Sequence, residues 1–320
     1  MLSLGHIMLG EYEVGLEEFE WRLKWEQQNN LGVRKFSQPR WEGEPLEGRT
    51  ILLYAEEGYG DTLQFVRYAR LVAEAGGRVL LEVPKALLTL LRTYPGVAEC
   101  VSVGDTLPEF DLRCPMMSLA LRFGTTLQTI PEVALPVPQP EISSTERLRV
   151  GLVWAGNKDH KWDCQRSLSL KQFAPLWRLA EAVQFVSLQK GDGEAQLAEA
   201  QLPFALENGV AAVNDFADTA AVIAGLDLVI AVDTAVAHLA GSLKKPLWIL
   251  IPGAPDWRWG LTGETTPWYP TARIFRANGN GRTSSDSRVD GGLELMERVA
   301  GELEKLCERR YEDVTQSLTA

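Results

Sequence analysis

The stretch LDLVIAVDTAVAHLAGSLKKPLWILIP, residues 226–252, decides the fold. LDLVIAVD reads as a buried strand, TAVAHLAGSL as a helix, and PLWILIP as a second buried strand. Two apolar strands joined by a helix indicate parallel pairing in a sheet that helices cover on both faces. The stretch therefore predicts an α/β fold.

The same alternation extends from this stretch in both directions. Within the C-terminal half, we expect strands at 149–156, 183–189 and 210–213 and helices near 170–180, 193–200 and 218–225. In the N-terminal half, the pattern predicts strands at 51–56, 78–84, 98–103 and 110–113 and helices at 61–77 and 85–96. After a Gly/Ser/Asn loop at 277–292, a last helix is expected at 291–306, packed back on the first half.

Two helices precede the first strand, with a break at Gly10-Glu11. Small and aromatic residues there have the spacing of the latter part of a tetratricopeptide repeat (Gly10, Tyr12, Gly15 and Phe19). An ordinary helical hairpin is the alternative. Because one such repeat cannot bury both of its faces, we expect the chain to begin inside a truncated repeat array.

A proline-rich pause separates the two alternating halves. Residues 131–147 carry four prolines and no apolar periodicity, which is typical of a linker. The expected organisation is a tetratricopeptide-type helical hairpin at 1–26, a connector at 27–48, Rossmann-like domains at 49–140 and 148–276, and a C-terminal helix at 290–308.

The composition excludes several classes of function. The chain has 320 residues and a formal net charge of −11, with no basic run, which argues against nucleic acid as a partner. No segment approaches the length of a transmembrane span, and the start lacks the pattern of a signal peptide. The four cysteines are scattered without metal-ligand spacing, so we expect a cytoplasmic protein with reduced thiols and no metal site.

Polar groups converge where the strand ending at Asp233 meets its helix. Open α/β sheets bind ligands at the carboxyl ends of their strands. Thr234 and Ala235 open a helix whose free N–H groups and dipole favour a phosphate, and His238 lies one turn further on the same face as Thr234. The pattern predicts a diphosphate site. The alternative is that Asp233 or Thr234 only caps the helix and His238 packs in the core.

The segment DTAVAHLAGSLKKP resembles the D-[TS]-x-x-x-H-x-A-G segment of heptosyltransferase-like family 9 glycosyltransferases. It resembles more closely the glycosyltransferase module that follows tetratricopeptide repeats in many bacterial proteins. Further motifs of that group occur in order over residues 2–276: WEGEPLEGRTILLYAEEGYGDTLQFVRYA, VGLVWAGN, HKWDCQRSLSL, FVSLQKG and PDWRWGLTGETTPWYPTARIFR. The resemblance implies a GT-B fold, in which an acceptor-side domain and a nucleotide-sugar domain face a cleft.

The resemblance also implies an activity. It is the metal-independent transfer of a hexosyl or heptosyl group from a nucleotide-sugar co-substrate, linked to UDP, GDP or ADP, to a hydroxyl of a protein or glycan acceptor. No further cofactor is expected. Two alternatives remain open: a sugar-nucleotide epimerase-like enzyme, and a catalytically inactive GT-B module that serves for binding or as a scaffold.

Asp61 is the residue for which two roles compete most directly. Gly58 and Gly60 let the loop EEGYGDTLQF, residues 56–65, pass close to a ligand, and Asp61 stands at its exit. The resemblance suggests that Asp61 is the base that takes a proton from the acceptor hydroxyl. The alternative is an N-cap, since a helix is expected to begin immediately after it.

Three more segments supply candidate residues. The loop AGNKDHKWDCQRSL, residues 155–168, has Lys158 where the group usually has proline, and the resemblance favours His160, Asp163 and Arg166 as its site residues. By its chemistry, Arg166 is expected to bind diphosphate oxygens, and His160 either to neutralise the leaving group or to orient Asp163. Gln189 and Lys190, after the next strand, are expected near the nucleotide. Further residues expected to line the cleft are Asn157, Asp163 and Trp257, the last in a Trp-rich loop with Arg258 and Trp259.

Overall fold

The computed structural model describes residues 2–29, 36–133, 135–136, 147–200, 202–277 and 285–319. Contacts divide the chain into two compact units. Unit 1 comprises Met1–Pro136, Asn214–Ala217 and Trp257–Thr262, and unit 2 comprises Val137–Val213, Asp218–Asp256 and Gly263–Ala320. Residue 134 and residues 137–146 of the expected linker lie outside the described residues, and the expected domain bounds stay a prediction.

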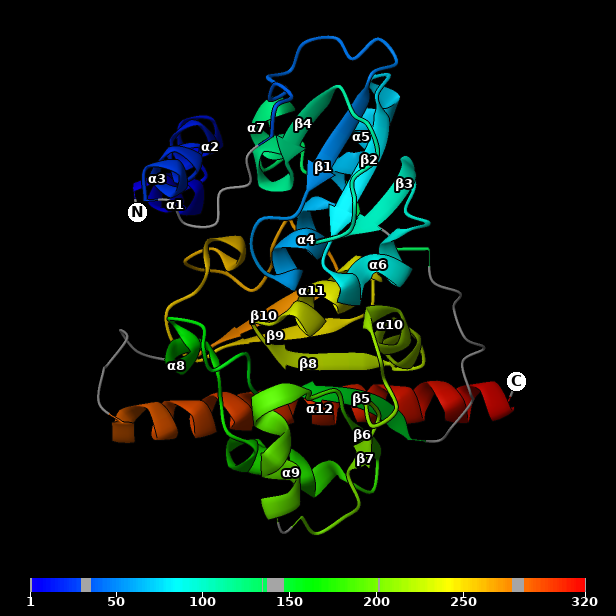
Figure 1. Cartoon of the computed structure of the whole chain (residues 1–320). Helices are drawn as coiled ribbons and strands as arrows, with labels where there is room; N and C mark the ends of the chain where they lie inside the picture. Colours follow the sequence, from blue (N-terminus) through cyan, green and yellow to red (C-terminus); the bar gives the residue numbers. More distant parts are fainter. Residues whose placement is uncertain are drawn as a thin grey trace. The chain divides into compact units, whose positions relative to one another are not determined.

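Unit 1 is built on a four-stranded sheet in the order β3-β2-β1-β4 (Figure 1). The strands are β1 (Thr50–Tyr54), β2 (Arg78–Val83), β3 (Val97–Ser102) and β4 (Leu112–Pro115), and every pair is parallel. Apolar residues fill the central strand, where Ile51, Leu52 and Leu53 are fully buried. The helices that accompany them are α4 (Tyr59–Phe65), α5 (Tyr68–Glu74), α6 (Lys85–Leu91), η1 (Met116–Ser118) and α7 (Leu119–Arg122).

The single helix expected at 61–77 is wrong, because α4 and α5 are separate helices. Arg67 lies between them and is buried. Its Nε donates to the carbonyl of Gln64 at 2.7 Å, and its Nη1 donates to the carbonyl of Pro131 at 3.0 Å. The first of these carbonyls would accept the amide of Tyr68 in a continuous α-helix. The arginine side chain takes that position, and the helix divides there.

The N-terminal segment forms α1 (Leu2–Met8), α2 (Tyr12–Phe19) and α3 (Trp21–Asn29). The break expected at Gly10-Glu11 is confirmed, since α1 ends at Met8 and α2 begins at Tyr12. Ile7, Tyr12 and Leu16 bury the faces on which α1 and α2 meet. These helices belong to unit 1. Their origin as a tetratricopeptide repeat stays a prediction.

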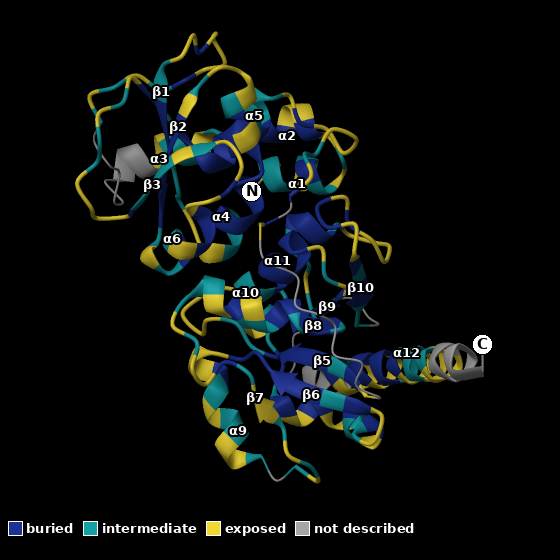
Figure 2. Ribbon diagram, turned by 90° about the vertical axis from the view of Figure 1, so that its right-hand side faces the viewer, coloured by how far each residue is buried: buried dark blue, intermediate teal, exposed yellow. Residues whose placement is uncertain are grey.

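Unit 2 contains a six-stranded parallel sheet in the order β10-β9-β8-β5-β6-β7. Its strands are β5 (Leu148–Val153), β6 (Val183–Ser187), β7 (Glu207–Asn208), β8 (Leu228–Val232), β9 (Leu247–Ile251) and β10 (Ala272–Arg276). Figure 2 shows the central strands in the colour of buried residues, and all five residues of β8 are buried. The expectation of two Rossmann-like parallel sheets is therefore confirmed.

Two expected elements of unit 2 differ in the structure. The strand expected at 210–213 lies at β7 instead, because the side-chain oxygen of Asn208 accepts the amide of Val210 at 3.2 Å and turns the chain. The helix expected near 170–180 is the 3₁₀ helix η2 (Leu170–Leu179), since Pro175 removes an amide donor inside it. The remaining helices of unit 2 are α8 (Asp163–Arg166), η3 (Gly191–Glu194), α9 (Ala195–Glu199), α11 (Ala235–Ser242) and α12 (Ser285–Thr319). α10 (Phe216–Ala224) begins in unit 1 and continues in unit 2, and η4 (Trp257–Trp259) belongs to unit 1.

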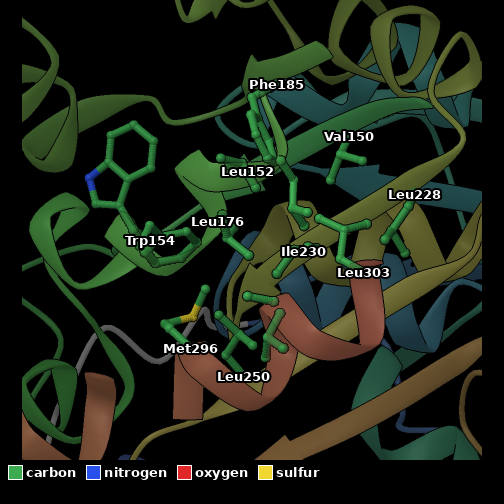
Figure 3. Close-up of a cluster of buried hydrophobic side chains, with 14 of the residues drawn as sticks. Val150, Leu152, Trp154, Leu176, Phe185, Leu228, Ile230, Leu250, Met296 and Leu303 are labelled. Carbon is green, nitrogen blue, oxygen red and sulfur yellow. The ribbon is translucent and has the colours of Figure 1, made fainter. Parts of the chain in front are cut away.

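The last helix packs on its own unit. Figure 3 shows Met296 and Leu303 of α12 among core residues of the sheet, including Leu152 and Ile230. α12 contacts η2 and β10, so the expectation that this helix packs on the first half is wrong. The apolar face of α12 is matched by the apolar face of η2, and burying both stabilises unit 2. Residues 278–284 of the expected loop at 277–292 lie outside the described residues.

Candidate functional site

The strand order places one topological switch point in each sheet. In unit 2 the chain runs from β5 outward to β6 and β7, and then returns to the other side of β5 with β8, β9 and β10. The connections after β5 and β8 therefore leave in opposite directions, and parallel sheets bind ligands at such a switch point. In unit 1 the corresponding point lies between β1 and β4. The candidate residues follow these four strands.

Thr234 is the N-cap of α11 and has extended backbone angles. Its side chain makes no capping hydrogen bond, so the alternative that this hydroxyl only caps the helix is not seen. Thr234 is 8% exposed, and its Oγ1 has no hydrogen-bond partner in the described part of the chain. The first amides of an α-helix also have no partner within the helix, and they carry the positive end of its dipole. A buried hydroxyl and the amides of Ala235 and its neighbours thus form a set of donors suited to an anion.

His238 is held in one orientation at the same helix end. It is 5% exposed, and its Nδ1 lies 2.8 Å from the hydroxyl of Tyr269. Its Nε2 lies 3.7 Å from Oδ1 of Asp233, the residue that follows β8. Tyr269 packs closely on Gly241, where a Cβ would lie 2.4 Å from the tyrosine ring. The structure thus brings Asp233, Thr234, Ala235 and His238 together, as the sequence analysis predicts.

Arg166 braces the loop that follows β5. Its Nε donates to Oδ1 of Asp163 at 3.2 Å, and the same oxygen accepts the hydroxyl of Ser167 at 2.7 Å. Ser167 in turn accepts the amide of Gly156 at 2.9 Å. The guanidinium lies directly over Gly156, where an added Cβ would be 2.4 Å from Nη2 and would displace the arginine side chain. The Arg166 side chain is 21% exposed, and Asp163 is its one carboxylate partner among the described residues.

Gln189 has a structural role that the sequence analysis does not predict. It is 1% exposed. Its Oε1 accepts the amides of Trp154 at 3.1 Å and Ala155 at 2.9 Å, and its Nε2 donates to the carbonyls of Ala155 at 3.0 Å and Lys190 at 2.9 Å. The side-chain amide therefore joins the ends of β5 and β6. These four bonds use both donors and both acceptor positions of the amide, so we no longer assign Gln189 to the nucleotide.

The other candidates of unit 2 are more exposed. His160 lies in the loop after β5, where its Nδ1 accepts the amide of Trp162 at 3.3 Å. Asn157 accepts the amide of Asp159 at 2.9 Å, and its carbonyl faces Nη2 of Arg166 at 3.5 Å. Lys190 follows β6 and donates to the carbonyl of Val213.

In unit 1, Asp61 is the third residue of α4 and Gly58 is its N-cap. The amide of Gly58 donates to Oδ2 of Asp61 at 2.9 Å. The alternative that Asp61 is itself the N-cap is therefore wrong, although its carboxylate does bond the amide of the N-cap residue. Gly60 lies inside the helix. Oδ1 of Asp61 forms an ion pair with Nη2 of Arg258.

The partners of Arg258 are the main feature that the sequence analysis misses. Arg258 belongs to η4, and Nε of its guanidinium donates to Oε1 of Gln64. Trp257 is 8% exposed, and its ring lies 4.4 Å from the Arg258 guanidinium, so it supports the arginine. Asp61 and Arg258 are separated by 197 positions, and no local pattern connects them.

Comparisons with known proteins agree with this geometry. Residues 175–287 match the model of glycosyltransferase family 9 (heptosyltransferase). This segment of the chain is therefore similar to family 9 glycosyltransferases. The chain resembles the crystal structure of a family 9 glycosyl transferase from Veillonella parvula, with a TM-score of 0.62 and 12% identity over 84% of this chain and 100% of the other. ADP-heptose LPS heptosyltransferase II of E. coli gives a TM-score of 0.54 and 18% identity, covering 80% of this chain and 99% of that one.

Among curated proteins, the chain is 29% identical to protein FlbA of Caulobacter vibrioides, over 74% of this chain. It spans 44% of the length of that relative. The two parallel sheets are similar in fold to those of the GT-B heptosyltransferases. Within the described residues, no helix is long and apolar enough to cross a membrane. No group of three or more His, Cys, Asp or Glu side chains is arranged to hold a metal ion in that same part of the chain.

Proposed function

We propose that this chain transfers a glycosyl group from a nucleotide diphosphate sugar to a hydroxyl acceptor. The observation that carries the proposal is the buried Thr234 hydroxyl, whose Oγ1 has no partner in the described chain and which lies beside the N-terminal amides of α11. An unpaired buried hydroxyl costs about 1–3 kcal/mol. A phosphate oxygen that accepts from this hydroxyl and from the amides would remove that cost.

The diphosphate would lie at the switch point of unit 2. Thr234 and the amide of Ala235 would donate to one phosphate, and Arg166 would neutralise charge from the loop on the other side of the switch point. His238 lies in the first turns of the same helix. We assign it to holding Asp233 in place, and through Asp233 to orienting the hydrogen-bond donors of the site. The donor set consists of amides, a hydroxyl and cationic side chains, so the proposed binding is independent of metal. The first donor to test is an ADP-linked heptose, by analogy with the name of the E. coli heptosyltransferase; UDP- and GDP-linked sugars come next.

The reaction needs a base and a leaving group. Asp61 would take the proton of the acceptor hydroxyl while the acceptor oxygen bonds to the anomeric carbon. The bond between that carbon and the diphosphate oxygen breaks, and the nucleoside diphosphate leaves with the electron pair. Arg166, His160 and the α11 dipole would stabilise the charge on the leaving group. We assign the acceptor to the class of protein or glycan hydroxyls.

Titration calorimetry with ADP, UDP and GDP in the presence of EDTA tests the donor site. At least one nucleotide should bind, and Thr234→Val should weaken it by about 1.5–3 kcal/mol, or ~10- to 150-fold, because a charged hydrogen bond is lost. Thr271→Val is the control, since Thr271 is exposed and stands before the amino end of β10, whereas Thr234 follows the carboxyl end of the parallel strand β8. Arg166→Ala should weaken binding as well, whereas Arg178→Ala should not, because Arg178 pairs with Glu297 on α12.

Turnover assays separate transfer from the alternatives. Release of nucleoside diphosphate that depends on an acceptor supports transfer, and conversion of the donor without an acceptor supports an epimerase. If no nucleotide binds in EDTA, or if Thr234→Val binds as tightly as the wild type, the proposed site is wrong.

A further inference from the structure

We infer that Arg258 is a positioning residue for Asp61, which it holds in the orientation that base catalysis requires. This inference rests on the proposed function, in which Asp61 is the base. Arg258 comes from a segment that follows β9 in the sequence, yet by its contacts Trp257–Thr262 belongs to unit 1, the unit that contains α4. The ion pair is therefore an internal contact of unit 1.

The guanidinium is held from several directions. Arg258 is 9% exposed, and Trp257 stacks on it with 4.4 Å between the guanidinium carbon and the ring centroid. Trp257 in turn lies 6.4 Å, between ring centroids, from Phe65 at the end of α4. Nε of Arg258 donates to Gln64, which is fully buried, and Nη2 donates to Asp61. Asp61 and Gln64 are three positions apart on α4, so one guanidinium spans both side chains on one face of the helix.

The carboxylate of Asp61 is fixed at both oxygens as a result. Oδ2 accepts the amide of Gly58 at 2.9 Å, and Oδ1 accepts from Arg258. Two contacts from opposite sides define the plane of the carboxylate, and each oxygen keeps a further lone pair for the acceptor hydroxyl. The Asp61 side chain is 22% exposed, so its carboxylate is not closed off from solvent. A base held in this way does not need to reorient when the acceptor binds, so no conformational entropy is lost at that step.

The arrangement predicts how variants of Arg258 behave. In the full-length chain, Arg258→Gln should lower kcat by about 10²-fold, the size expected for a misplaced catalytic group, with the donor KM nearly unchanged. Arg258→Lys should restore part of the rate, because an ammonium group still donates to Oδ1 although it cannot reach Gln64 at the same time. A purely structural role would lower the apparent kcat only in proportion to the loss of folded protein, and the folded fraction measured by circular dichroism accounts for that loss.

A double-mutant cycle with Asp61→Asn decides whether Arg258 acts through Asp61. If it does, adding Arg258→Gln to Asp61→Asn should leave the residual rate unchanged, because the base that Arg258 positions is already absent. If the two substitutions multiply, the inference is overturned. It is also overturned if Arg258→Gln is as active as the wild type, or more active, which would mean that the ion pair restrains the base.

The same four proteins separate this inference from the proposed function. Wild-type protein without turnover toward any donor would overturn the proposed function. The unfolding free energies of the cycle would then still test the contact itself, with an expected coupling of about tenfold in the unfolding equilibrium, or about 1.4 kcal/mol. If the wild type turns over, Asp61→Asn abolishes turnover and Arg258→Gln does not change it, the proposed function stands and only this inference is overturned.

Discussion

The guanidinium of Arg22 in α3 donates to both carboxylate oxygens of Glu56, from Nε to Oε1 at 3.1 Å and from Nη2 to Oε2 at 3.0 Å. The two side chains are 13% and 7% exposed. Glu56 also accepts the amide of Met117 at 3.2 Å, so it joins the end of β1 to the segment after β4. Burial opposes the charge of Arg22, yet the carboxylates of Glu56 and Glu20 raise its pKa above the ordinary value. The N-terminal helices are thereby tied to the loop that leads to Asp61.

Removing one member of this pair should destabilise unit 1. Arg22→Ala leaves the Glu56 carboxylate buried without its main partner, and we expect a loss of about 3–5 kcal/mol. Urea unfolding followed by tryptophan fluorescence measures it. Replacing both residues, with Arg22→Met and Glu56→Leu, should recover much of the loss. Arg70→Ala is the control, because its pair with Glu74 is exposed and should contribute less than about 1 kcal/mol. Equal losses for Arg22→Ala and Arg70→Ala would contradict the prediction.

Two helical glycines should respond in opposite directions to alanine. At Gly241 in α11, a Cβ would lie 2.4 Å from the ring of Tyr269, which bonds His238. Gly241→Ala should therefore destabilise the chain by about 1–3 kcal/mol and weaken nucleotide binding. At Gly301 in α12, no described atom lies within 4 Å of the added Cβ, and Gly301→Ala should stabilise the chain by about 0.5–1 kcal/mol. Thermal unfolding measures both changes in stability, and titration calorimetry measures nucleotide binding. If both variants gain stability, or both lose it, the packing described at these two glycines is contradicted.

The thiols should differ in reactivity. Burial raises the pKa of Cys100 to about 11 and raises that of Cys114 further, whereas Cys164 is exposed in α8. Because the thiolate is the reactive form, a thiol reagent such as DTNB at pH 8 should modify Cys164 first. Cys164→Ser should remove that fast phase, and Cys100→Ser should leave it in place. Rapid modification that persists in Cys164→Ser would show that the described burial is wrong.

Much of the fold could be predicted because its information is local. Apolar runs and intervening helices indicate both parallel sheets, and the start of α11 at Thr234 follows from the order of strand and helix. β10 is missed because Ala272–Arg276 contains two arginines and only a short apolar run. The division between α4 and α5 could not be predicted, because the helical pattern of the sequence continues through it. It depends on the side chain of Arg67, which donates to the carbonyl of Gln64.

The candidate site divides in the same way. Thr234, Ala235 and His238 are neighbours in sequence, so their convergence could be predicted from one turn of helix. The role of Gln189 depends on hydrogen bonds to Trp154 and Ala155, which lie 35 and 34 positions away. The ion pair between Asp61 and Arg258 spans 197 positions. Contacts of this length depend on the packing of whole elements, which composition and periodicity do not encode residue by residue.

The stability of unit 2 should depend on pH through Glu302 of α12. Hydrogen bonds from Lys305 and from Arg273 of β10 lower the pKa of Glu302 from 4.5 to about 2. A carboxyl whose folded pKa is lowered contributes stability above its unfolded value of 4.5, and this contribution is lost as the pH falls from there toward 2. Glu302→Gln should therefore be less stable than the wild type at pH 7, and the difference should vanish near pH 2. Melting temperatures measured across this range test it, and a difference independent of pH would contradict it.

Gln189→Glu separates the structural role of Gln189 from a role in binding nucleotide. The variant keeps an acceptor for the amides of Trp154 and Ala155, but a carboxylate then faces the carbonyls of Ala155 and Lys190, to which the amide group donates. We expect a loss of about 2–4 kcal/mol at pH 7, since two buried carbonyls lose their donor and a charge is buried. Part of the loss should be recovered at lower pH relative to the wild type, because a protonated carboxyl again donates to one carbonyl.

Gln196→Glu is the matched control, since Gln196 accepts the amide of Leu170 at 2.8 Å, is only half-buried, and keeps that bond as glutamate. Urea unfolding at both pH values measures the losses. If Gln189→Glu is as stable as the control and instead binds nucleotide more weakly, Gln189 belongs to the nucleotide site after all.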